Sequence, residues 1–555
     1  MLRNPGSQAT DSLERRLLKA VAVWKANDAC SEDGRPRSGQ AMLRRDFVKW
    51  LLALGAGLRG GTLLGGLLPG GRKILAGRLP GRAFPVTVQW SRLPDGTEAA
   101  KPFAALSKSE IHAVIDEIIG HGFTGLEYPL AGPAGQTSEA LKYAQRRGMY
   151  VTYDRTFMKG GVENIPRNAP PPVSVFSPEY AVQVRRNVVA AFEQVKGIAR
   201  PYNMFGYHDE PFHEGPESFD YSEPVRREFK NRYGYDLPPD VDSAMRDPKV
   251  WLDVISFRSD EFTAGWRQAY RIIKEINPGI QVALTHDSHS TFGAGVRSNS
   301  KLAVDDVFHW GADFADTFVF DIYPYMMFDF RYGECGTLRK PRMSQMHYAF
   351  AQMRNLTYTY GKELEQITEG KKPFWMVLQV CWSGVAKPGK TLRFPTFPQE
   401  RYMAFQSIID GARGLVFFDG TVKACLNARD SELGWNWTFY QNVLKLVLNQ
   451  LNPSGPVFPA LVAPDSKLDV KLSGASDIEY RAREADGYLY ILAAKRQGAT
   501  VHVRFSGLPS DVGSGDVLFE EPRKVTVSDG EFTDWFAPHD VHIYRFKEAG
   551  RSSEQ

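Results

Sequence analysis

Eight short apolar runs alternate with amphipathic helical segments between residues 84 and 420, and this alternation constrains the fold more than any other feature. The runs are FPVTVQW (84–90), FTGLEYPL (123–130), MYVTYDRTF (149–157), NMFGYHDEP (203–211), QVALTHDSH (281–289), DTFVFDIYPY (316–325), FWMVLQVCW (374–382) and GLVFFDG (414–420). Most begin with continuous apolar or β-branched residues, as strands buried on both faces require. Strand patterns that alternate with helical patterns are typical of parallel βα units. Eight units in order predict a (β/α)8 barrel, the TIM barrel.

Helix start and stop signals support this prediction. Ser107 followed by Glu110 forms a capping box pattern at the start of one segment. The segments with helical periodicity are 107–122, 177–197, 250–279 and 396–414. A doubly wound open sheet remains the alternative. Such a sheet usually carries a Gly-rich phosphate turn after its first strand, and residues 89–96 (QWSRLPDG) do not have that pattern.

The pattern changes after Pro453. Short alternating runs within residues 461–546, separated in places by Asp486-Gly487 and Asp529-Gly530 turns, predict a small antiparallel β-sandwich. The runs are DIEYRARE (477–484), YLYILAAK (488–495), TVHVRFSG (500–507), RKVTVSD (523–529) and HDVHIYRF (539–546). The sequence thus divides into an N-terminal extension with a signal region (1–83), a catalytic barrel (84–455), a C-terminal β-sandwich (456–548) and a tail (549–555).

Residues 42–58 read MLRRDFVKWLLALGAGL, two arginines followed by an apolar run. This is a signal-peptide pattern, and the run is too short for an ordinary transmembrane helix. Arg44 and Arg45, with Phe47 two residues on, resemble a twin-arginine export signal. The resemblance implies a folded protein exported to the periplasm or beyond, with no stable membrane insertion after export.

Charge and cysteine content narrow the expected partners. The formal net charge is only +4 over 555 residues and basic residues are spread along the chain, so we expect no nucleic-acid partner. Four cysteines are too few for a disulfide scaffold, and no CxxC or His-Cys spacing indicates a metal site. We therefore expect neither a metal nor a cofactor. The sequence leaves the oligomeric state open.

In a (β/α) barrel the catalytic groups project from the C-terminal ends of the strands. The polar and aromatic residues that end the eight runs are therefore the candidate site residues. They are Trp90, Glu127, Asp154, His208, Asp209, Glu210, His286, Asp287, Asp321, Tyr323, Tyr325, Gln379, Trp382 and Asp419. Several carboxylates at one barrel mouth, rimmed by Trp and Tyr, suit glycoside hydrolysis. That reaction needs one carboxylic acid to protonate the leaving oxygen and one carboxylate to stabilise or attack the oxocarbenium-like centre.

Several motifs also resemble a known group. GYHDEP (206–211), at the end of the fourth run, resembles the Asn-Glu-Pro signature of clan A glycoside hydrolases. VRREFKNRYGYDL (225–237) and DIYPY (321–325) are similar to elements of family 42 β-galactosidases, and residues 84–450 match that layout. The resemblance implies galactosidase-like hydrolysis of a saccharide, with Glu210 as the general acid/base and Asp209 in place of the usual Asn.

The chain departs from this pattern at one position. The clan places its nucleophilic Glu at the end of the seventh strand, where this sequence has Gln379, and an amide cannot act as a carboxylate nucleophile. We expect Asp321 to be the nucleophile or general base, with Asp287 as the second choice. The remaining residues are expected to bind substrate: Trp90, Glu127, Asp154, His208, Asp209, His286, Tyr323, Tyr325, Gln379, Trp382 and Asp419.

Two other interpretations stay open, because barrels host many chemistries. Gln379 suggests a non-catalytic carbohydrate-binding protein on a hydrolase scaffold. His286, Asp287 and His289 suggest a different barrel enzyme, such as a lyase or a metal-dependent hydrolase. Sugar binding without turnover would favour the first, and bound metal in the purified protein would favour the second.

Overall fold

The structure, a computed structural model, describes residues 83–89, 106–128, 134–154, 173–194, 204–206, 220–287, 314–321, 372–380, 395–418, 440–496 and 498–547. The expected export signal lies outside these residues. Within them, no helix is long and apolar enough to cross a membrane.

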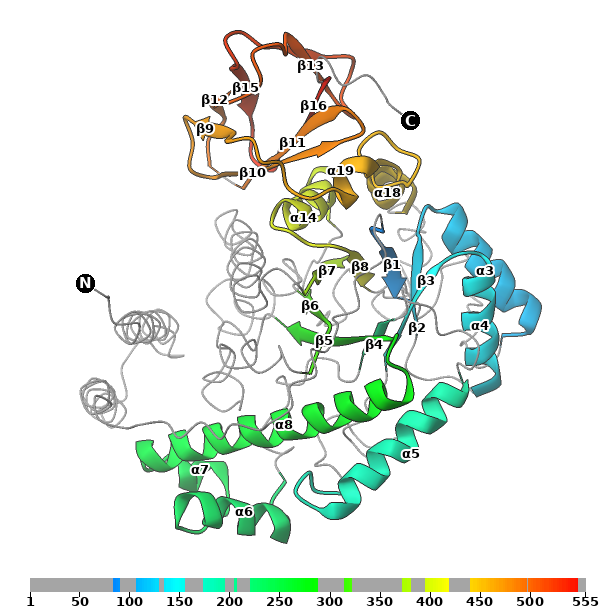
Figure 1. Cartoon of the computed structure of the whole chain (residues 1–555), viewed down its shortest axis with the longest axis vertical. Helices are drawn as coiled ribbons and strands as arrows, with labels where there is room; N and C mark the ends of the chain where they lie inside the picture. Colours follow the sequence, from blue (N-terminus) through cyan, green and yellow to red (C-terminus); the bar gives the residue numbers. More distant parts are fainter. Residues whose placement is uncertain are drawn as a thin grey trace, which may run out of the picture.

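Eight parallel strands close into a barrel in chain order (Figure 1). The strands are β1 (Val86–Gln89), β2 (Gly125–Tyr128), β3 (Tyr150–Asp154), β4 (Met204–Gly206), β5 (Gln281–Asp287), β6 (Thr317–Asp321), β7 (Phe374–Gln379) and β8 (Leu415–Phe418). Each lies within one of the eight predicted runs. Strand β1 pairs with both β2 and β8, so the sheet has no open edge and the doubly wound alternative is wrong.

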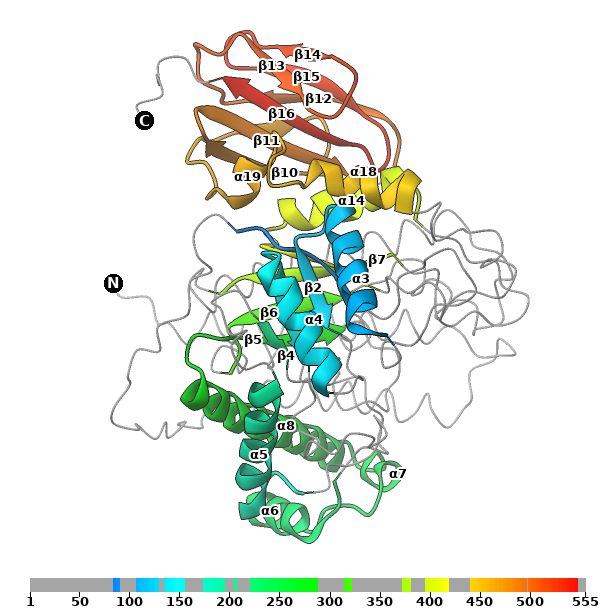
Figure 2. The same cartoon turned by 90° about the vertical axis from the view of Figure 1, so that its right-hand side faces the viewer.

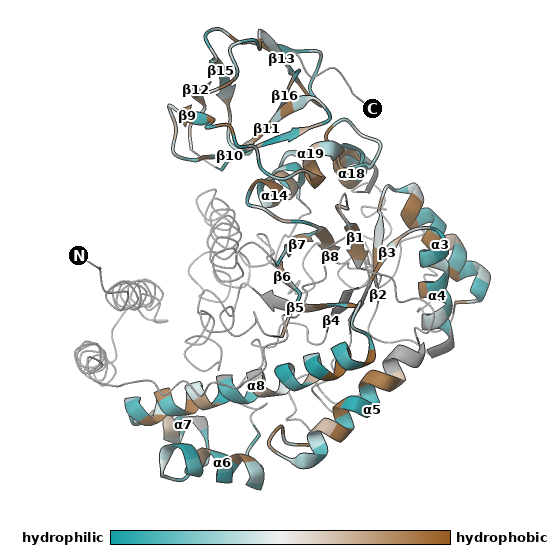
Figure 3. Ribbon diagram, viewed as in Figure 1, coloured by the Kyte–Doolittle hydropathy of each residue, from teal (hydrophilic) through white to brown (hydrophobic). Residues whose placement is uncertain are grey.

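Helices follow the strands wherever the connection is described. They are α3 (Lys108–Gly120), α4 (Ala134–Arg146), α5 (Pro178–Gln194), α6 (Glu223–Tyr233), α7 (Val241–Ala244), α8 (Pro248–Ile276) and α14 (Phe397–Ile409). At α3 the Ser107 hydroxyl accepts from the Glu110 N–H while the Glu110 carboxylate accepts from the Ser107 N–H, which confirms the capping box. The connections after β5 and β6 are not among the described residues. Figure 3 shows apolar colour on β1 and β8 and largely hydrophilic colour on α6 and α8.

The barrel strands separate an inner face from an outer one. One buried cluster is formed by Ala283, Val319, Trp375, Val377 and Val416. Their strand neighbours, such as Phe320 and Met376, belong instead to the larger core that includes helix residues. Because successive strand residues point to opposite faces, the first cluster fills the barrel interior. Near the N-terminal ends of the strands the Trp375 ring needs a glycine beside it, since a Cβ on Gly414 would lie 2.5 Å from that ring.

The C-terminal region forms two antiparallel sheets, as the sequence predicts. One has the order β10 (Ile478–Ala485), β11 (Tyr488–Lys495), β16 (Val541–Lys547), β13 (Ser514–Val517) and β14 (Lys524–Thr526). The other has the order β15 (Phe532–Phe536), β12 (Val501–Ser506) and β9 (Lys471–Ser473). At the predicted Asp486-Gly487 turn, which joins β10 to β11, both residues have positive φ, as a tight hairpin requires.

Helix α14 packs between the barrel and the sandwich, with α18 (Lys445–Gln450) and α19 (Phe458–Val462) beside it (Figure 2). A single hydrophobic core runs from the barrel strands through α14 to Leu492 and Ile543 of the sandwich. The sandwich also has a separate core between its two sheets, which includes Phe505 and Phe532. The barrel and the sandwich therefore share one hydrophobic core where they meet.

Two arginines of β10 reinforce this junction. Arg481 donates through Nε to the Ile409 carbonyl, and the fully buried Arg483 donates to the Ile408 carbonyl at 3.5 Å. These carbonyls end α14, where intrahelical donors are missing and a positive charge is favoured. Asp465 balances the charge, since its carboxylate lies 2.7 Å from Arg481 and 3.4 Å from Arg483. The sandwich thus caps the helix between β7 and β8.

Candidate functional site

Acidic residues stand at the C-terminal ends of four barrel strands. Asp154, Asp287 and Asp321 are the last residues of β3, β5 and β6, and Glu127 is the penultimate residue of β2. Gln379 is the last residue of β7. Since all eight strands are parallel, these positions lie at the same end of the barrel. The structure brings these five predicted positions to one mouth.

The register places two of them side by side. Asp287 and Asp321 are directly paired Cα partners on β5 and β6. Paired residues on neighbouring strands lie about 4.8 Å apart. Asp321 is two residues from Val319, and Asp287 is four residues from Ala283, so both positions belong to the strand face that fills the barrel interior.

Gln379 shares this inner face with Trp375 and Val377, and its side chain is fully buried, with 0% exposure. A buried amide has hydrogen-bonding capacity but no charge at any ordinary pH. The end of the seventh strand therefore supplies polarity to the barrel mouth without a carboxylate.

His286 and Asp287 are successive residues of β5, so they belong to opposite faces of the strand. A ligand set that needs both of them at one metal ion is disfavoured by this arrangement. Among the described residues, no group of three or more His, Cys, Asp or Glu residues is placed to hold a metal ion.

Other predicted site residues lie outside the part of the chain that the structure describes. They are Trp90, His208, Asp209, Glu210, Tyr323, Tyr325, Trp382 and Asp419. His289 lies outside it as well.

The segment that carries Glu210 is held at both of its described ends. Gly206 ends β4 and is paired with Asp154 on one side and Ala283 on the other. At the other end the Asp220 carbonyl accepts a 2.8 Å hydrogen bond from Arg258, whose side chain is 1% exposed. The two residues that these contacts fix, Gly206 and Asp220, are therefore 14 positions apart in the sequence.

Arg258 is a structural residue that sequence reasoning missed. Its guanidinium also contacts the Glu261 carboxylate at 2.5 Å, one turn further along α8. Burial raises the pKa of Glu261, while the adjacent Arg258 charge lowers it in part. A buried charge is stable when it is paired and hydrogen-bonded, so this pair fixes the residue at which the Glu210 segment returns to the core. Charged residues occur along α8 as they do in an exposed helix, so the sequence does not indicate that Arg258 and Glu261 form a buried pair.

Comparison with known proteins identifies a fold. No family model matches the chain, and no curated protein matches it in sequence. A catalytic mutant of a GH42 β-galactosidase from G. stearothermophilus is similar, with a TM-score of 0.50 and 9% identity over 84% of this chain and 98% of that one. The chain shares its fold with a glycoside hydrolase barrel. A β-galactosidase from Bacillus circulans sp. alkalophilus matches with a TM-score of 0.48 and 10% identity, over 84% of this chain and 99% of that chain.

A second residue that the sequence did not indicate is Glu400, in the first turn of α14. This helix follows β7, so its first turn is at the end of the helix nearer the barrel mouth. The Glu400 side chain is 0% exposed, and neither carboxylate oxygen has a hydrogen-bond partner among the described residues. Burial raises the pKa of Glu400 well above its ordinary value, because the charged form loses its hydration.

We expect Glu400→Gln to stabilise the protein increasingly as the pH rises. In the unfolded chain Glu400 ionises near its ordinary pKa of about 4.3, whereas the folded protein keeps it protonated to higher pH. Its favourable contribution is present below the unfolded pKa and is lost as pH rises towards the folded pKa. Thermal unfolding between pH 4 and 8 measures this, with the exposed Glu521→Gln as the matched control. A melting temperature difference that stays constant with pH would contradict a neutral buried Glu400.

Proposed function

We propose that the protein is a glycoside hydrolase that cleaves a glycosidic bond in a saccharide, with galactosidase-like specificity. The observation that carries the proposal is the set of acidic residues that end four parallel strands of a closed barrel, with Asp287 and Asp321 in direct register. The likeness of fold to a glycoside hydrolase barrel supports it. The GYHDEP motif after β4 adds a candidate acid, Glu210.

The proposed reaction uses two carboxyl groups and no cofactor. Glu210 donates its proton to the leaving glycosidic oxygen while the bond from that oxygen to the anomeric carbon breaks. Asp321 attacks the anomeric carbon and forms a glycosyl ester. Water then attacks the same carbon, gives its proton to Glu210 and releases Asp321 as the free carboxylate. Asp287, in register with Asp321, is the alternative nucleophile or base.

Turnover of a panel of aryl α- and β-glycosides, both pyranosides and furanosides, tests the proposal. We expect the wild type to hydrolyse at least one member. We expect Asp321→Asn to reduce turnover by more than about 100-fold, because an amide cannot form the glycosyl ester. Azide is expected to restore consumption of an activated substrate in this variant, by attacking the anomeric carbon directly and releasing a glycosyl azide.

Asp287→Asn is the matched comparison on the neighbouring strand. Azide rescue in this variant and not in Asp321→Asn would exchange the two roles. Hydrolysis that survives in both single variants would sink the assignment of the nucleophile to this pair of strands. No turnover of any panel member by the wild type would remove the hydrolase proposal itself.

A non-catalytic carbohydrate-binding protein is the second candidate, and the buried Gln379 favours it. This candidate predicts saccharide binding by the wild type without turnover of any panel member. The same panel, read by both binding and product release, distinguishes the two candidates.

A further inference from the structure

The C-terminal sandwich carries one aromatic side chain that the fold does not bury. Trp535 on β15 is 61% exposed, which makes it the most exposed large hydrophobic residue among those described. Its strand neighbours Asp534 and Phe536 lie on the opposite face, where Phe536 is fully buried in the core between the sheets. Trp535 therefore stands on the outward face of the three-stranded sheet.

A second ring lies beside it. His502 on β12 is the direct cross-strand partner of Trp535, and the two ring centroids are 4.7 Å apart at an interplanar angle of 36°. These two rings form the aromatic part of the outward face.

The next row along the same face is polar. Arg504 is paired with Thr533 on one side and with Ser473 on the other. The Arg504 guanidinium also lies 3.4 Å from the Glu531 carboxylate, and both side chains are exposed. Donors and acceptors thus stand two residues along the strands from the aromatic pair, about 6.8 Å away.

Charge on this face is balanced. Arg504 is matched by Glu531, and Lys471 on β9 lies 3.0 Å from Asp469. A site that binds a polyanion needs a cluster of basic groups without acidic partners, and Arg504 and Lys471 both have such partners. A stable protein interface needs an apolar centre of several large residues, and this face has one Trp. A neutral ligand that is rich in hydroxyl groups, with an apolar ring face, matches both features.

We propose that this face binds a neutral saccharide, with one sugar ring stacked on Trp535 and His502 and its hydroxyl groups bonded by Arg504, Glu531 and Thr533. The face is in the sandwich, apart from the barrel mouth. The proposal does not depend on Glu210, Asp287 or Asp321 and holds for an enzyme or a pure binding protein.

Affinity electrophoresis of the full chain in native gels tests this proposal. The gels contain soluble galactan, xylan, glucomannan or starch, and the protein carries Glu210→Gln so that it does not degrade them. We expect at least one neutral polysaccharide to retard the protein. Trp535→Ala is expected to weaken that binding by about tenfold or more, because the stacking surface is lost.

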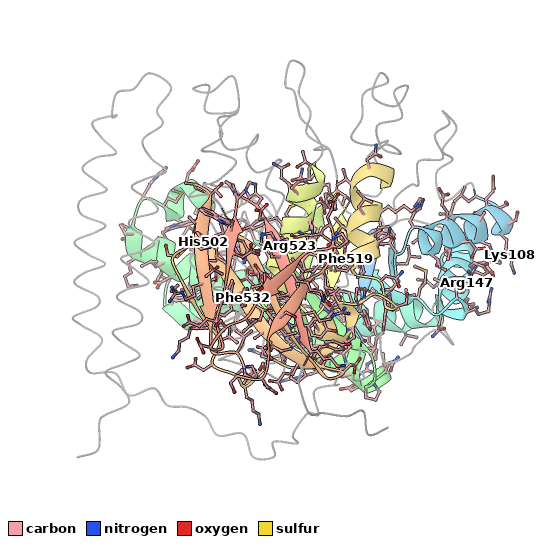
Figure 4. All side chains as sticks on the ribbon, turned by 90° about the horizontal axis from the view of Figure 1, so that it is seen from above. Lys108, Arg147, His502, Phe519, Arg523 and Phe532 are labelled. Carbon is pink, nitrogen blue, oxygen red and sulfur yellow. The ribbon has the colours of Figure 1, made fainter. Side chains whose placement is uncertain are left out.

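Phe519→Ala is the matched control, since Phe519 is another exposed aromatic residue of the sandwich, between β13 and β14 (Figure 4). We expect it to bind as the parent does. Thermal unfolding confirms that both variants fold. In a chain with native Glu210, Trp535→Ala is expected to leave the hydrolysis of small aryl glycosides unchanged.

Three results would overturn the proposal: no retardation by any neutral polysaccharide, equal retardation of the parent and Trp535→Ala, or retardation by the polyanion heparin alone. Failure of the hydrolase proposal has a different signature. The wild type would then turn over no glycoside, while Trp535-dependent retardation would persist.

Discussion

Glu210→Gln is expected to slow hydrolysis of glycosides with poor leaving groups, such as disaccharides, by about 10²–10⁴-fold, the usual contribution of general acid catalysis. Glycosides with an activated leaving group such as dinitrophenol need little protonation, so we expect a much smaller effect on the step that releases the phenol. The measurement is kcat/KM for a series of leaving groups of rising pKa, compared between the variant and the wild type.

The physical basis is the position of Glu210 relative to the barrel. It follows β4 by four residues, and β4 lies between β3 and β5, which end in Asp154 and Asp287. The chain returns to the core at Asp220, where Arg258 holds its carbonyl. Gly206, the last residue of β4, is at the same end of the barrel as these acidic residues, which is why we propose Glu210 as the acid.

Asp209→Asn is the matched control for this experiment. It removes a neighbouring carboxylate that we expect to bind substrate rather than to protonate it, so its effect should be smaller and independent of the leaving group. The basic limb of the pH profile of kcat/KM should disappear in Glu210→Gln and persist in Asp209→Asn. A loss in Glu210→Gln that is equal across all leaving groups would show that Glu210 does not protonate the leaving oxygen.

The barrel was predictable because its strands are marked by hydrophobicity on both faces. Each of the eight runs contains one strand, and the capping signals at Ser107 and Glu110 set a helix boundary correctly. Three sandwich strands, β9, β13 and β15, were not predicted as separate strands. Two of them are only three or four residues long, and β13 contains Gly515, so they show no alternation of useful length. Strand β15 (FTDWF) places an exposed Trp535 where the pattern calls for a polar residue.

The acidic rim of the barrel was predictable for a similar reason, since the end of a buried strand is visible in the sequence. The pairing of Asp287 with Asp321 was not, because register depends on barrel closure. Buried charges were missed altogether. Arg258, Glu400 and Arg483 occur in charged, ordinary-looking helix and strand patterns, and only tertiary packing removes them from solvent.

Arg483→Met is expected to destabilise the whole protein by roughly 2–6 kcal/mol, because two buried carbonyls lose their donor at about 1–3 kcal/mol each. Arg483 is fully buried, and its Nη1 donates to the Ala460 carbonyl at 2.8 Å and the Leu461 carbonyl at 3.2 Å. The variant leaves these two carbonyls without this donor, whereas the Ile408 carbonyl keeps a hydrogen bond from the Gly411 N–H at 3.1 Å. Each unsatisfied buried group costs about 1–3 kcal/mol.

The effect should extend beyond the sandwich, because the lost contacts belong to the junction. Ile408 is in α14 between β7 and β8, and Ala460 and Leu461 are in α19. The continuous core from barrel to sandwich makes separate unfolding of either part costly. We therefore expect one cooperative transition in urea for both the wild type and Arg483→Met, with a lower midpoint and a similar slope in the variant.

Hydrogen exchange followed by mass spectrometry distinguishes a shared effect from a local one. Peptides from β7, α14 and β8 should lose protection in Arg483→Met together with peptides from β10 and β11. Arg504→Met is the matched control, since Arg504 is an exposed arginine of the same sandwich whose surface ion pair contributes at most about 1 kcal/mol. Loss of protection confined to the sandwich strands would show that barrel and sandwich fold independently. It would then follow that the buried arginines fix only how the two parts are docked.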